Sequence, residues 1–492
     1  MLDADTRTER PGPARHVVVV GGGIAGLAAA HRLLADGFRV TLLEASERLG
    51  GKLYAGELAG LPVDLGAESL LARRPEAVAL ARAVGLGDAL QPPATATAHL
   101  WTRGAMRPMP RGHVMGVPGD TAPLAASGVL SAEGLARIDA DTVLAPTEVG
   151  DDVAVGEYVA ARMGREVVDR LVEPLLGGVY AGDAYRISMR AAVPALFAAI
   201  RTHPTLTESV RSLQGGAAGR AAAARTTLTG AAATGAVFAG IAGGVGRLPL
   251  AVADACRAAG ARIRTGTPVS GIGRTPAGWR ITAGEETLDA DAVVLATPAG
   301  PAARLLAPLA PAAATALRET EYASMALVTL AFRRSELPGA LADGGASGFL
   351  VPPVDGRTIK ASTFSSNKWA WSGADPGLFL LRTSVGRHGD EGDLEREDGE
   401  LVDVSLADLG EAVGLTARPV ASAVTRWDRG LPQYPVGHLA RVARIRAAVA
   451  GLPGLAVCGA LYDGVGVPAC VESAHKAVEA VSAAMATPVT DH

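Results

Sequence analysis

Cysteine is scarce in this chain: the 492 residues include three cysteines, Cys256, Cys458 and Cys470. So few cysteines exclude a scaffold held together by disulfides. The sequence also lacks a Cys-x-x-Cys pair or a His/Cys cluster of the kind that binds structural zinc, so we expect no metal site. This cysteine usage is typical of a reducing compartment, and we expect a cytoplasmic protein.

Aromatic residues, excess charge and long apolar runs are also scarce. The 7 Phe, 5 Trp and 7 Tyr leave most of the core packing to Ala, Val and Leu. The 46 Lys+Arg nearly balance 50 Asp+Glu, giving a net charge of −4, so we expect no nucleic-acid partner. The apolar stretch 17–30 contains four glycines and is too short to span a bilayer, so we expect no transmembrane segment. Peripheral contact with a membrane stays open.

The N-terminal part predicts a loose tail followed by a strand–helix–strand unit. Residues 1–15 are charged and proline-rich, unlike a signal peptide. Residues 17–20 (VVVV) predict a strand buried on both faces, residues 27–34 a helix, and residues 38–43 a second strand. The unit spans about 30 residues, the length that such a parallel crossover needs.

A glycine-rich turn, Gly21-x-Gly23-x-x-Gly26, lies between the first strand and the helix. The first glycine permits a tight turn, the second lets a pyrophosphate approach the backbone, and the third lets the helix pack on the strand. Glu44 follows Gly26 by 18 residues, at the end of the second strand. A carboxylate there accepts hydrogen bonds from an unphosphorylated ribose, which favours FAD or NAD over NADP.

Three further segments favour FAD. Residues 48–52 (RLGGK) place a glycine pair beside basic residues, which suits close approach to a second phosphate. Residues 62–69 (PVDLGAES) form a loop that can pass close to a flat ring. Residues 455–482 repeat the strand, glycine turn and helix, with GVGVP at 464–468. The N-terminus of that helix can stabilise negative charge on a reduced flavin.

These segments resemble those of the FAD-dependent amine-oxidase-like flavoproteins. Within that superfamily, the chain is similar to the porphyrinogen oxidases of haem biosynthesis over about residues 16–480. The likeness is carried by LGAESLLARRPE (65–76), MRPMPRGHVMGVP (106–118), VEPLLGGVYAGD (172–183), TRWDRGLPQYPVGH (425–438) and YDGVGVPAC (462–470). It is strongest with the Gram-positive bacterial type, which oxidises coproporphyrinogen III to coproporphyrin III.

The resemblance implies where the FAD cofactor would be bound. The predicted contacts involve the pyrophosphate, the ribose, the adenine, the central part of FAD and the flavin ring. They are Gly21, Gly22, Gly23, Ile24, Ala25, Gly26, Leu27, Glu44, Ala45, Lys52, Gly66, Ala67, Glu68, Ser69, Val269, Trp427, Val465, Gly466 and Val467.

The resemblance also implies the reaction and its partners. Three hydride transfers to the flavin, each with loss of a pyrrole N–H proton, remove six electrons, and dioxygen reoxidises the flavin to give hydrogen peroxide. No catalytic residue beyond the flavin is expected. We expect His113, His388, His438 and His475 to be structural or exposed. A transient contact with a ferrochelatase is a further expectation.

Basic residues near the flavin are expected to bind the carboxylates of the substrate. The candidates are Arg73, Arg74, Arg111 and Lys368. Bacterial relatives often have a lysine in the pair that is Arg73-Arg74 here. Arginine can still bind a carboxylate, but it stays protonated and is a poor base. Coproporphyrinogen carries four propionates and protoporphyrinogen two, so a more charged pocket would favour the former.

The predicted fold class is α/β plus α+β: a discontinuous Rossmann-like FAD-binding domain with an inserted substrate-binding domain and a helical domain. The expected parts are a tail (1–15), the FAD-binding domain (16–75, 237–300 and 430–485), the substrate-binding domain (76–95 and 301–429), a mainly helical domain (96–211) and a flexible Ala/Gly-rich loop (212–236).

Other functions stay open at this point. A protoporphyrinogen IX oxidase would use the same chemistry. A flavin amine oxidase or a desaturase would use the same fold, but the scarcity of aromatic residues counts against the aromatic cage usual in amine oxidases. A catalytically silent FAD-binding regulator is a further alternative.

Overall fold

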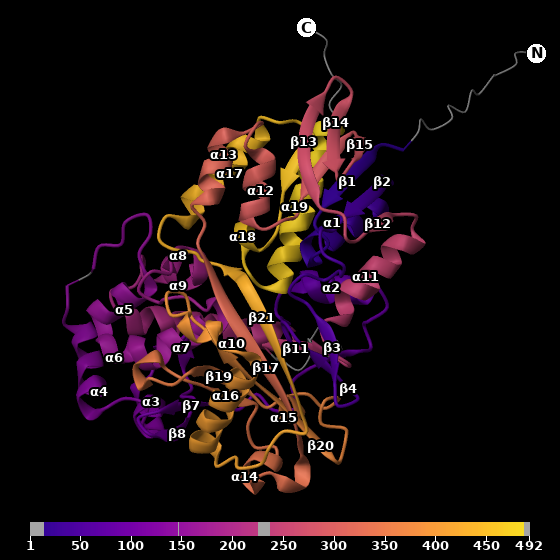
Figure 1. Ribbon diagram of the computed structural model, residues 1–492. Helices are drawn as coiled ribbons and strands as arrows, with labels where there is room; N and C mark the ends of the chain where they lie inside the picture. Colours follow the sequence, from indigo (N-terminus) through magenta and orange to yellow (C-terminus); the bar gives the residue numbers. More distant parts are fainter. Residues whose placement is uncertain (1–13, 146, 225–236, 487–492) are drawn as a thin grey trace, which may run out of the picture.

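The computed structural model describes residues 14–145, 147–224 and 237–486. A parallel sheet of order β12-β2-β1-β16-β22 forms the centre of the upper part in Figure 1. Its strands are β1 (His16–Val20), β2 (Arg39–Leu43), β12 (Arg262–Arg264), β16 (Ala292–Leu295) and β22 (Leu455–Val457). Because these strands come from three distant parts of the chain, the predicted discontinuous Rossmann-like fold is confirmed.

Both faces of this sheet are covered, as the VVVV run predicts. Val17 and Val19 are fully buried in a core with α1 (Ile24–Ala35), α2 (Pro75–Ala83), α11 (Arg247–Ala258) and α19 (Val467–Ala486). Val18 and Val20 point into a second core. That core includes α12 (Ala299–Leu306), α13 (Pro311–Arg318), α17 (His438–Ala450) and the sheet of β13 (Val269–Thr275), β14 (Gly278–Ala283) and β15 (Glu286–Ala290).

A seven-stranded mixed sheet of order β21-β17-β20-β19-β18-β7-β8 forms the lower part in Figure 1. Helix α16 (Asp398–Val413) covers one face, where Val328, Phe379 and Leu381 are fully buried. The opposite face carries the partly exposed side chains described below. The strands are β7 (Ala98–Thr102), β8 (Ala105–Pro108), β17 (Tyr322–Arg333), β18 (Gly348–Leu350), β19 (Ile359–Thr363), β20 (Leu378–Val385) and β21 (Ala421–Pro432).

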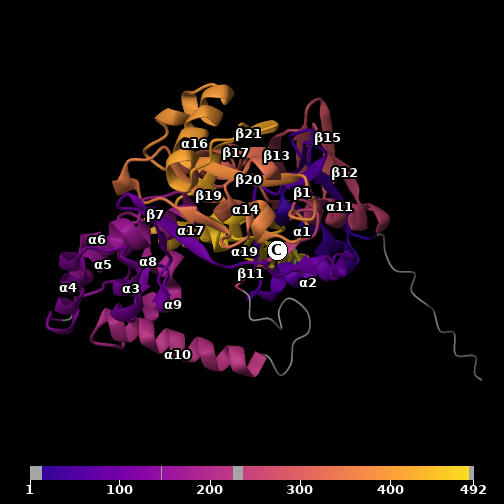
Figure 2. The ribbon, with the colours of Figure 1, turned by 90° about the horizontal axis from the view of Figure 1, so that it is seen from below.

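A lobe of helices lies beside the seven-stranded sheet, and Figure 2 shows α10 along its outer edge. Its interior holds an ion pair: Arg162 donates to Asp141 at 2.6 Å, and both side chains are at most 1% exposed. The helices are α3 (Thr121–Ser127), α4 (Ala132–Ile138), α5 (Val155–Met163), α6 (Arg165–Val167), α7 (Glu173–Tyr180), α8 (Met189–Ala192), α9 (Pro194–Ala199) and α10 (Leu206–Ala224).

Short elements connect these parts. Strands β3 and β4 form a hairpin, and β5, β11 and β6 form a small sheet. These elements are β3 (Ala55–Leu58), β4 (Leu61–Asp64), β5 (Leu70–Leu71), β6 (Leu90–Gln91), β11 (Phe238–Ile241), α14 (Gly339–Ala342), α15 (Ser365–Lys368) and α18 (Ala460–Asp463).

Two expectations about secondary structure are wrong. Residues 98–118, expected to be mostly helical, form β7, β8, β9 (His113–Val114) and β10 (Val117–Pro118). Strand β7 pairs with β8 in a local hairpin and with β18, about 250 positions further along the chain; local sequence patterns do not reveal the second pairing. Residues 212–224, expected to be a flexible loop, continue helix α10, because alanine favours helix and Leu206 and Val210 anchor its first turns.

The packing of one segment also differs from the predicted domain division. The predicted division assigns residues 76–95 to the substrate-binding domain, together with residues 301–429. Instead Ala77, Leu80 and Ala81 of α2 are buried in the core that contains α1 and α19. The remainder of the expected loop, residues 225–236, and most of the expected tail lie outside the described residues.

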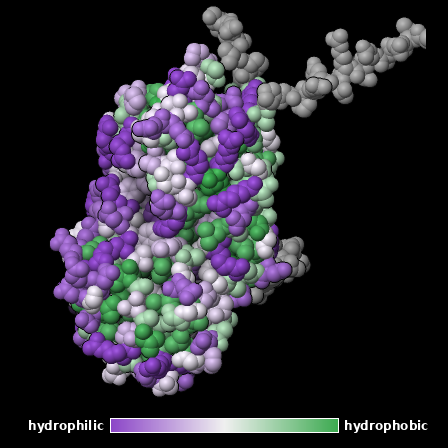
Figure 3. All heavy atoms as spheres, turned by 45° about the vertical axis from the view of Figure 1, so that its right-hand side comes forward, coloured by the Kyte–Doolittle hydropathy of each residue, from purple (hydrophilic) through white to green (hydrophobic). Residues whose placement is uncertain are grey.

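Two observations concern contact with a membrane: the character of the helices and the polarity of the surface. Within the described ranges, no helix combines the length and apolar character needed to cross a bilayer. The face shown in Figure 3 mixes hydrophilic and hydrophobic residues over both the upper and lower parts. Peripheral membrane contact therefore stays a prediction.

Candidate functional site

The turn between β1 and α1 faces open space. An ideal Cβ on Gly26 would lie 1.9 Å from the Gly21 carbonyl oxygen, so packing itself requires this glycine. A Cβ on Gly23 would meet no described atom within 4 Å. Helix α1 begins at Ile24 without a side-chain cap on its first N–H groups. An uncapped helix N-terminus beside open space fits a pyrophosphate.

Glu44 lies beside this turn, at the end of β2. Its Oε2 accepts from the Gly22 N–H at 2.6 Å, and its Oε1 accepts from the Ser46 N–H at 2.8 Å. The Ser46 hydroxyl also donates to Oε1, at 2.7 Å, but Oε2 has a second lone pair, so Glu44 can still accept from a ribose hydroxyl. The Thr267 N–H donates to the Glu44 carbonyl oxygen at 2.8 Å, which brings the start of β13 at Val269 close to Glu44.

The Gly50-Gly51-Lys52 segment packs against the same turn. The Gly50 N–H donates to the Gly22 carbonyl oxygen at 2.9 Å, and a Cβ on Gly51 would lie 3.3 Å from the Gly23 Cα. Burial lowers the pKa of Lys52, whose ammonium interacts electrostatically with the Cys470 thiol in α19. Because no carboxylate among the described residues pairs with it, Lys52 is available to an anionic cofactor.

The loop after β4 is fixed by three groups from distant parts of the chain. The Leu65 carbonyl oxygen accepts from Trp427 Nε1 at 3.2 Å, and the Gly66 carbonyl oxygen accepts from Arg382 Nη1 at 2.6 Å. The Glu68 carboxylate, 6% exposed, pairs with Lys368 at 2.6 Å and with Arg382 at 3.1 Å. The Gly66 carbonyl oxygen and the Glu68 side chain are therefore engaged within the protein, as is the Ala67 N–H, which donates to the Lys52 carbonyl oxygen at 3.0 Å; a contact of residues 66–69 with a cofactor stays a prediction.

Asp64 joins this loop to the GGVG segment before α11. Its buried carboxylate accepts from the Val245 N–H at 2.9 Å and from the Gly246 N–H at 2.8 Å. Burial is the largest effect on this group and raises its pKa to about 6 from 3.8. The folded protein therefore holds this proton more tightly than the unfolded chain.

We expect a pH-dependent stability from Asp64. Protonated Asp64 makes its full contribution to the free energy of unfolding below about pH 4. As the pH rises through about 6 this contribution is lost, which lowers the free energy of unfolding by about 3 kcal/mol at most. The measurement is the free energy of unfolding of the wild type minus that of Asp64→Asn, against pH. The Asn variant cannot titrate here, so the difference should fall between about pH 4 and pH 7. A difference that stays flat would contradict the assignment.

The C-terminal turn lies between α18 and α19. Gly464 has φ +131°, and a Cβ there would lie 2.9 Å from the Ala469 Cβ. Asp463 anchors the turn through ion pairs with Arg446 and with Lys476, the latter at 3.0 Å. Val465 packs against the apolar core of the helical lobe. The turn thus places the N-terminus of α19, at Val467, where it can face a flavin ring.

The four predicted substrate cations do not form one cluster of free charges. Arg74 pairs with Glu76 at 2.9 Å and with Glu472, and Lys368 pairs with Glu68. Arg73 and Arg111 are exposed and form no ion pair with any described residue. Arg73 and Arg111 therefore differ from the two paired cations in having no carboxylate partner among the described residues, and a role in binding substrate stays a prediction for all four.

A flat row of side chains crosses the open face of the seven-stranded sheet. Strand register aligns Leu350, Ala361, Ser384, Leu327 and Thr425 on five neighbouring strands, and we call this row the floor. All are partly exposed except Leu327, which is 9% exposed. The adjacent row contains Trp427, which donates to the loop after β4. Three of the five side chains, Ala361, Ser384 and Thr425, are small.

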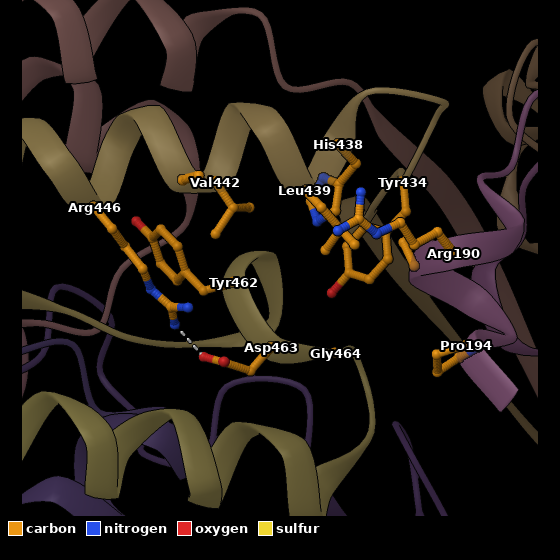
Figure 4. Close-up of a pocket in the computed structure, with 12 residues that line it drawn as sticks. Arg190, Pro194, Tyr434, His438, Leu439, Val442, Arg446, Tyr462, Asp463 and Gly464 are labelled. Carbon is orange, nitrogen blue, oxygen red and sulfur yellow. Dashed lines mark hydrogen bonds and ion pairs between the residues drawn. The ribbon is translucent and has the colours of Figure 1, made fainter. Parts of the chain in front are cut away.

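A separate pocket of about 450 Å³ opens behind the C-terminal turn, between α17, α18 and the α8–α9 segment (Figure 4). The Tyr434 and His438 rings stack there with centroids 3.9 Å apart. His438 is 1% exposed, and burial lowers its pKa to about 4, so this histidine is neutral. The pocket reaches Gly464 but contains none of the predicted substrate cations.

Sequence reasoning missed Arg382, Lys360 and Glu173. Arg382 is a single charge inside the apolar run LFLLRTSV, which was the available signal for an ion pair. Its partner Glu68 is more than 300 positions away in the chain. Glu173 and Lys360 are buried and lie near each other across α7 and β19. Their proximity follows from the tertiary packing and from no local pattern.

Comparison with known proteins shows the family. The family model described as flavin-containing amine oxidoreductase matches residues 24–482. The coproporphyrinogen III oxidase of Mycobacterium tuberculosis (strain ATCC 25618 / H37Rv) is 38% identical over 96% of this chain and 98% of that protein. The coproporphyrinogen III oxidase of Bacillus subtilis (strain 168) is 31% identical over 94% of this chain and 97% of that protein.

A solved structure agrees with these similarities. The putative protoporphyrinogen oxidase from Exiguobacterium sp. 255-15 has a TM-score of 0.82 and 31% identity, covering 96% of this chain and 100% of that one. The open helix N-terminus, the uncovered Gly23 and the unpaired Lys52 fit a flavin dinucleotide. The predicted resemblance is confirmed: the chain belongs to the flavin-containing amine oxidoreductase family, and its cofactor is FAD.

Proposed function

We propose that this chain uses FAD and dioxygen to oxidise coproporphyrinogen III to coproporphyrin III in haem biosynthesis. The observation that carries the proposal is the floor, a partly exposed row of side chains beside Trp427 on β21, which donates to the loop after β4 that contains Gly66. A tetrapyrrole that becomes planar as it is oxidised needs such a surface. Similarity over nearly the whole length to proteins named coproporphyrinogen III oxidase supports the same reaction.

The proposed mechanism divides the work between cofactor and chain. Bound FAD supplies the acceptor for hydride from a bridge carbon, three times per macrocycle, with dioxygen as final acceptor and hydrogen peroxide as by-product. The predicted FAD contacts, from Gly21 to Val467, are part of this proposal. Arg382 and Trp427 orient the backbone of the loop after β4, while Asp463 anchors the opposing turn. The floor shields one face of the reacting molecule from water.

Carboxylate recognition belongs to the exposed cations in this proposal. Arg73 and Arg111 are the candidates without a partner among the described residues. To bind a carboxylate of the substrate, Arg74 and Lys368 would first have to give up the glutamates with which they pair. Guanidinium groups bind carboxylates through two parallel hydrogen bonds. Four propionates give coproporphyrinogen more such contacts than protoporphyrinogen can make. We therefore expect the tetracarboxylate to be the better substrate.

Porphyrin fluorescence tests the proposal directly. Purified FAD-loaded protein in air is mixed with fresh coproporphyrinogen III or protoporphyrinogen IX, and a protein-free sample measures autoxidation. We expect fluorescence to grow at least about 10-fold faster with coproporphyrinogen, the ratio that about 1.4 kcal/mol of discrimination gives. The opposite preference would replace the proposed substrate. No growth above autoxidation with either would refute porphyrinogen oxidation.

Protoporphyrinogen IX oxidation is the second candidate. It is favoured by the solved Exiguobacterium structure, whose protein is described as a putative protoporphyrinogen oxidase. The floor alone does not distinguish the two macrocycles, because both are flat once oxidised. An amine oxidase or desaturase would follow only if neither porphyrinogen reacts.

A cytoplasmic location and delivery of product to a ferrochelatase complete the proposal. Porphyrins are poorly soluble and reactive, so direct transfer would protect them. A pull-down that recovers no complex, together with kinetics that show no channelling, would remove this partner.

A further inference from the structure

Glu173, the first residue of α7, carries a buried carboxylate that the scheme above does not use. Its side chain is 8% exposed, and Oε2 has no hydrogen-bond partner among the described residues. The charged groups that face it are Lys360 on β19, Arg387 after β20, Asp183 after α7 and Asp169 before α7. A buried carboxylate without a partner is costly, so its presence calls for a function.

The neighbouring cations are engaged with backbone oxygens. Lys360 Nζ donates to the Gly386 carbonyl oxygen at 2.8 Å, and Arg387 Nη2 donates to the Val351 carbonyl oxygen at 2.9 Å. Neither forms an ion pair with Glu173 in the part of the chain that the structure describes. Burial raises the pKa of Glu173 to about 7 and lowers the pKa of Lys360 to about 7. The carboxylate can therefore gain and lose a proton near neutral pH.

Helix α7, which carries Glu173, borders the floor. Helix α7 packs on β18 and β19, and a Cβ on Gly178 would lie 3.7 Å from Cδ2 of Leu350, the end residue of the floor. Lys360 directly precedes Ala361, another floor residue. Val465 of the C-terminal turn packs into the same core as Leu176 of α7. The helix thus borders both the floor and the turn that faces the cofactor.

Gly177, one turn further along α7, lies beside the carboxylate, and one of the two carboxylate oxygens, Oε2, is closed off from solvent. A Cβ on Gly177 would lie 3.5 Å from Glu173 Oε2, an ordinary van der Waals contact with an oxygen that is already buried. Gly178 and Val179, which follow it, are exposed. The proton of a molecule on the floor would therefore have to reach the other oxygen, Oε1, directly or through one water.

We propose that Glu173 is the base that takes up the pyrrole proton during porphyrinogen oxidation, with Lys360 as a positioning residue that sets its charge. This proposal rests on the proposed function. Each two-electron step breaks one bridge C–H bond, whose hydride goes to the bound FAD, and one pyrrole N–H bond. The proton forms an O–H bond on Glu173, and the N–H electron pair stays in the macrocycle as part of a new double bond. Arg73 and Arg74 cannot take this role, because a guanidinium does not give up its proton.

The test uses FAD-loaded wild type, Glu173→Gln, Lys360→Met and the control Glu157→Gln, an exposed glutamate on α5. We expect Glu173→Gln to lower kcat on coproporphyrinogen about 100-fold, the lower end for a general base, with FAD content and the oxidised flavin spectrum unchanged. The wild-type kcat/KM should rise with pH through about 7, and this rise should be absent in Glu173→Gln. Lys360→Met should move the midpoint to higher pH, because a nearby positive charge has gone.

Infrared spectroscopy of the resting holoenzyme gives a readout independent of turnover. A protonated-carboxyl band should titrate at about pH 7 in the wild type and in Glu157→Gln, and be missing in Glu173→Gln. Wild-type rate and pH profile in Glu173→Gln would overturn this proposal alone. A wild type that forms no porphyrin would overturn it together with the proposed function. Should Glu173→Gln lose FAD by misfolding, the Lys360→Met profile decides: an unshifted midpoint overturns the proposal.

Discussion

Replacing Gly23 with alanine should leave the protein folded and weaken FAD binding at least about 100-fold, or about 2.7 kcal/mol. Gly23 has φ −72°, which any residue can adopt, and an added Cβ would meet no described atom within 4 Å. The fold therefore tolerates the methyl group. The open space in front of Gly23 is where a pyrophosphate would approach the backbone, and the methyl group would hold it away. The measurement is the Kd for FAD of the apoprotein, with thermal unfolding recorded alongside.

Two other glycines provide the controls for this prediction. Gly26→Ala would place a Cβ 1.9 Å from the Gly21 carbonyl oxygen, so we expect it to destabilise the fold by about 3 kcal/mol. Gly273→Ala in β13 has open space around its Cβ and lies outside the turn, so it should bind FAD normally. Wild-type affinity in Gly23→Ala would show that the phosphates do not lie at this turn.

Glu68→Gln should lower the free energy of unfolding by about 3 kcal/mol, the lower end for breaking a buried ion pair. The substitution would leave Lys368 and Arg382, 18% and 14% exposed, without their shared anion. Burial alone would raise the pKa of Glu68, but the two cations hold it at about 2. The ion pairs therefore stabilise the fold fully at any pH above the range in which glutamate usually titrates, and this stabilisation is lost only in acid. Because Arg382 also holds the Gly66 carbonyl oxygen, FAD content should fall as well.

Chemical denaturation of matched variants checks this second prediction. Glu57→Gln removes an exposed carboxylate on β3 and should change stability by less than about 0.5 kcal/mol. The double variant Glu68→Gln/Lys368→Met removes one of the two unpaired cations and should recover part of the loss. Equal stability of Glu68→Gln and wild type would contradict the proposed role of this ion cluster.

The parts of the fold that the sequence predicted correctly are those governed by local pattern. Val17 to Val20 are at most 4% exposed, and a parallel strand covered on both sides requires such a continuous apolar run. The glycine spacing around Gly23 is set by contacts within the turn itself, so spacing alone indicated the helix N-terminus. The second glycine turn could be recognised in the same way.

The parts that were missed depend on contacts between distant residues. The Lys368–Glu68 pair joins positions 300 apart, so Lys368 read as a free cation although it is neutralised in the fold. Strand β7 pairs with the distant β18 as well as with its neighbour β8, and only the hairpin with β8 is local in the sequence. Helix α10 was misread because its Ala/Gly composition is typical of linkers, whereas Leu206 and Val210 anchor it in the lobe. Amino-acid composition indicates secondary-structure propensity, but tertiary packing determines which structure forms.

The central claim is that electrons pass from a porphyrinogen to the FAD held by this chain. Anaerobic mixing of FAD-loaded protein with coproporphyrinogen III, followed by the visible absorbance of the flavin, tests it most directly. The account predicts that the oxidised-flavin band disappears as porphyrin absorbance grows, and that the band returns when air is admitted. A flavin band that persists unchanged with coproporphyrinogen, while dithionite still bleaches it, would contradict the account.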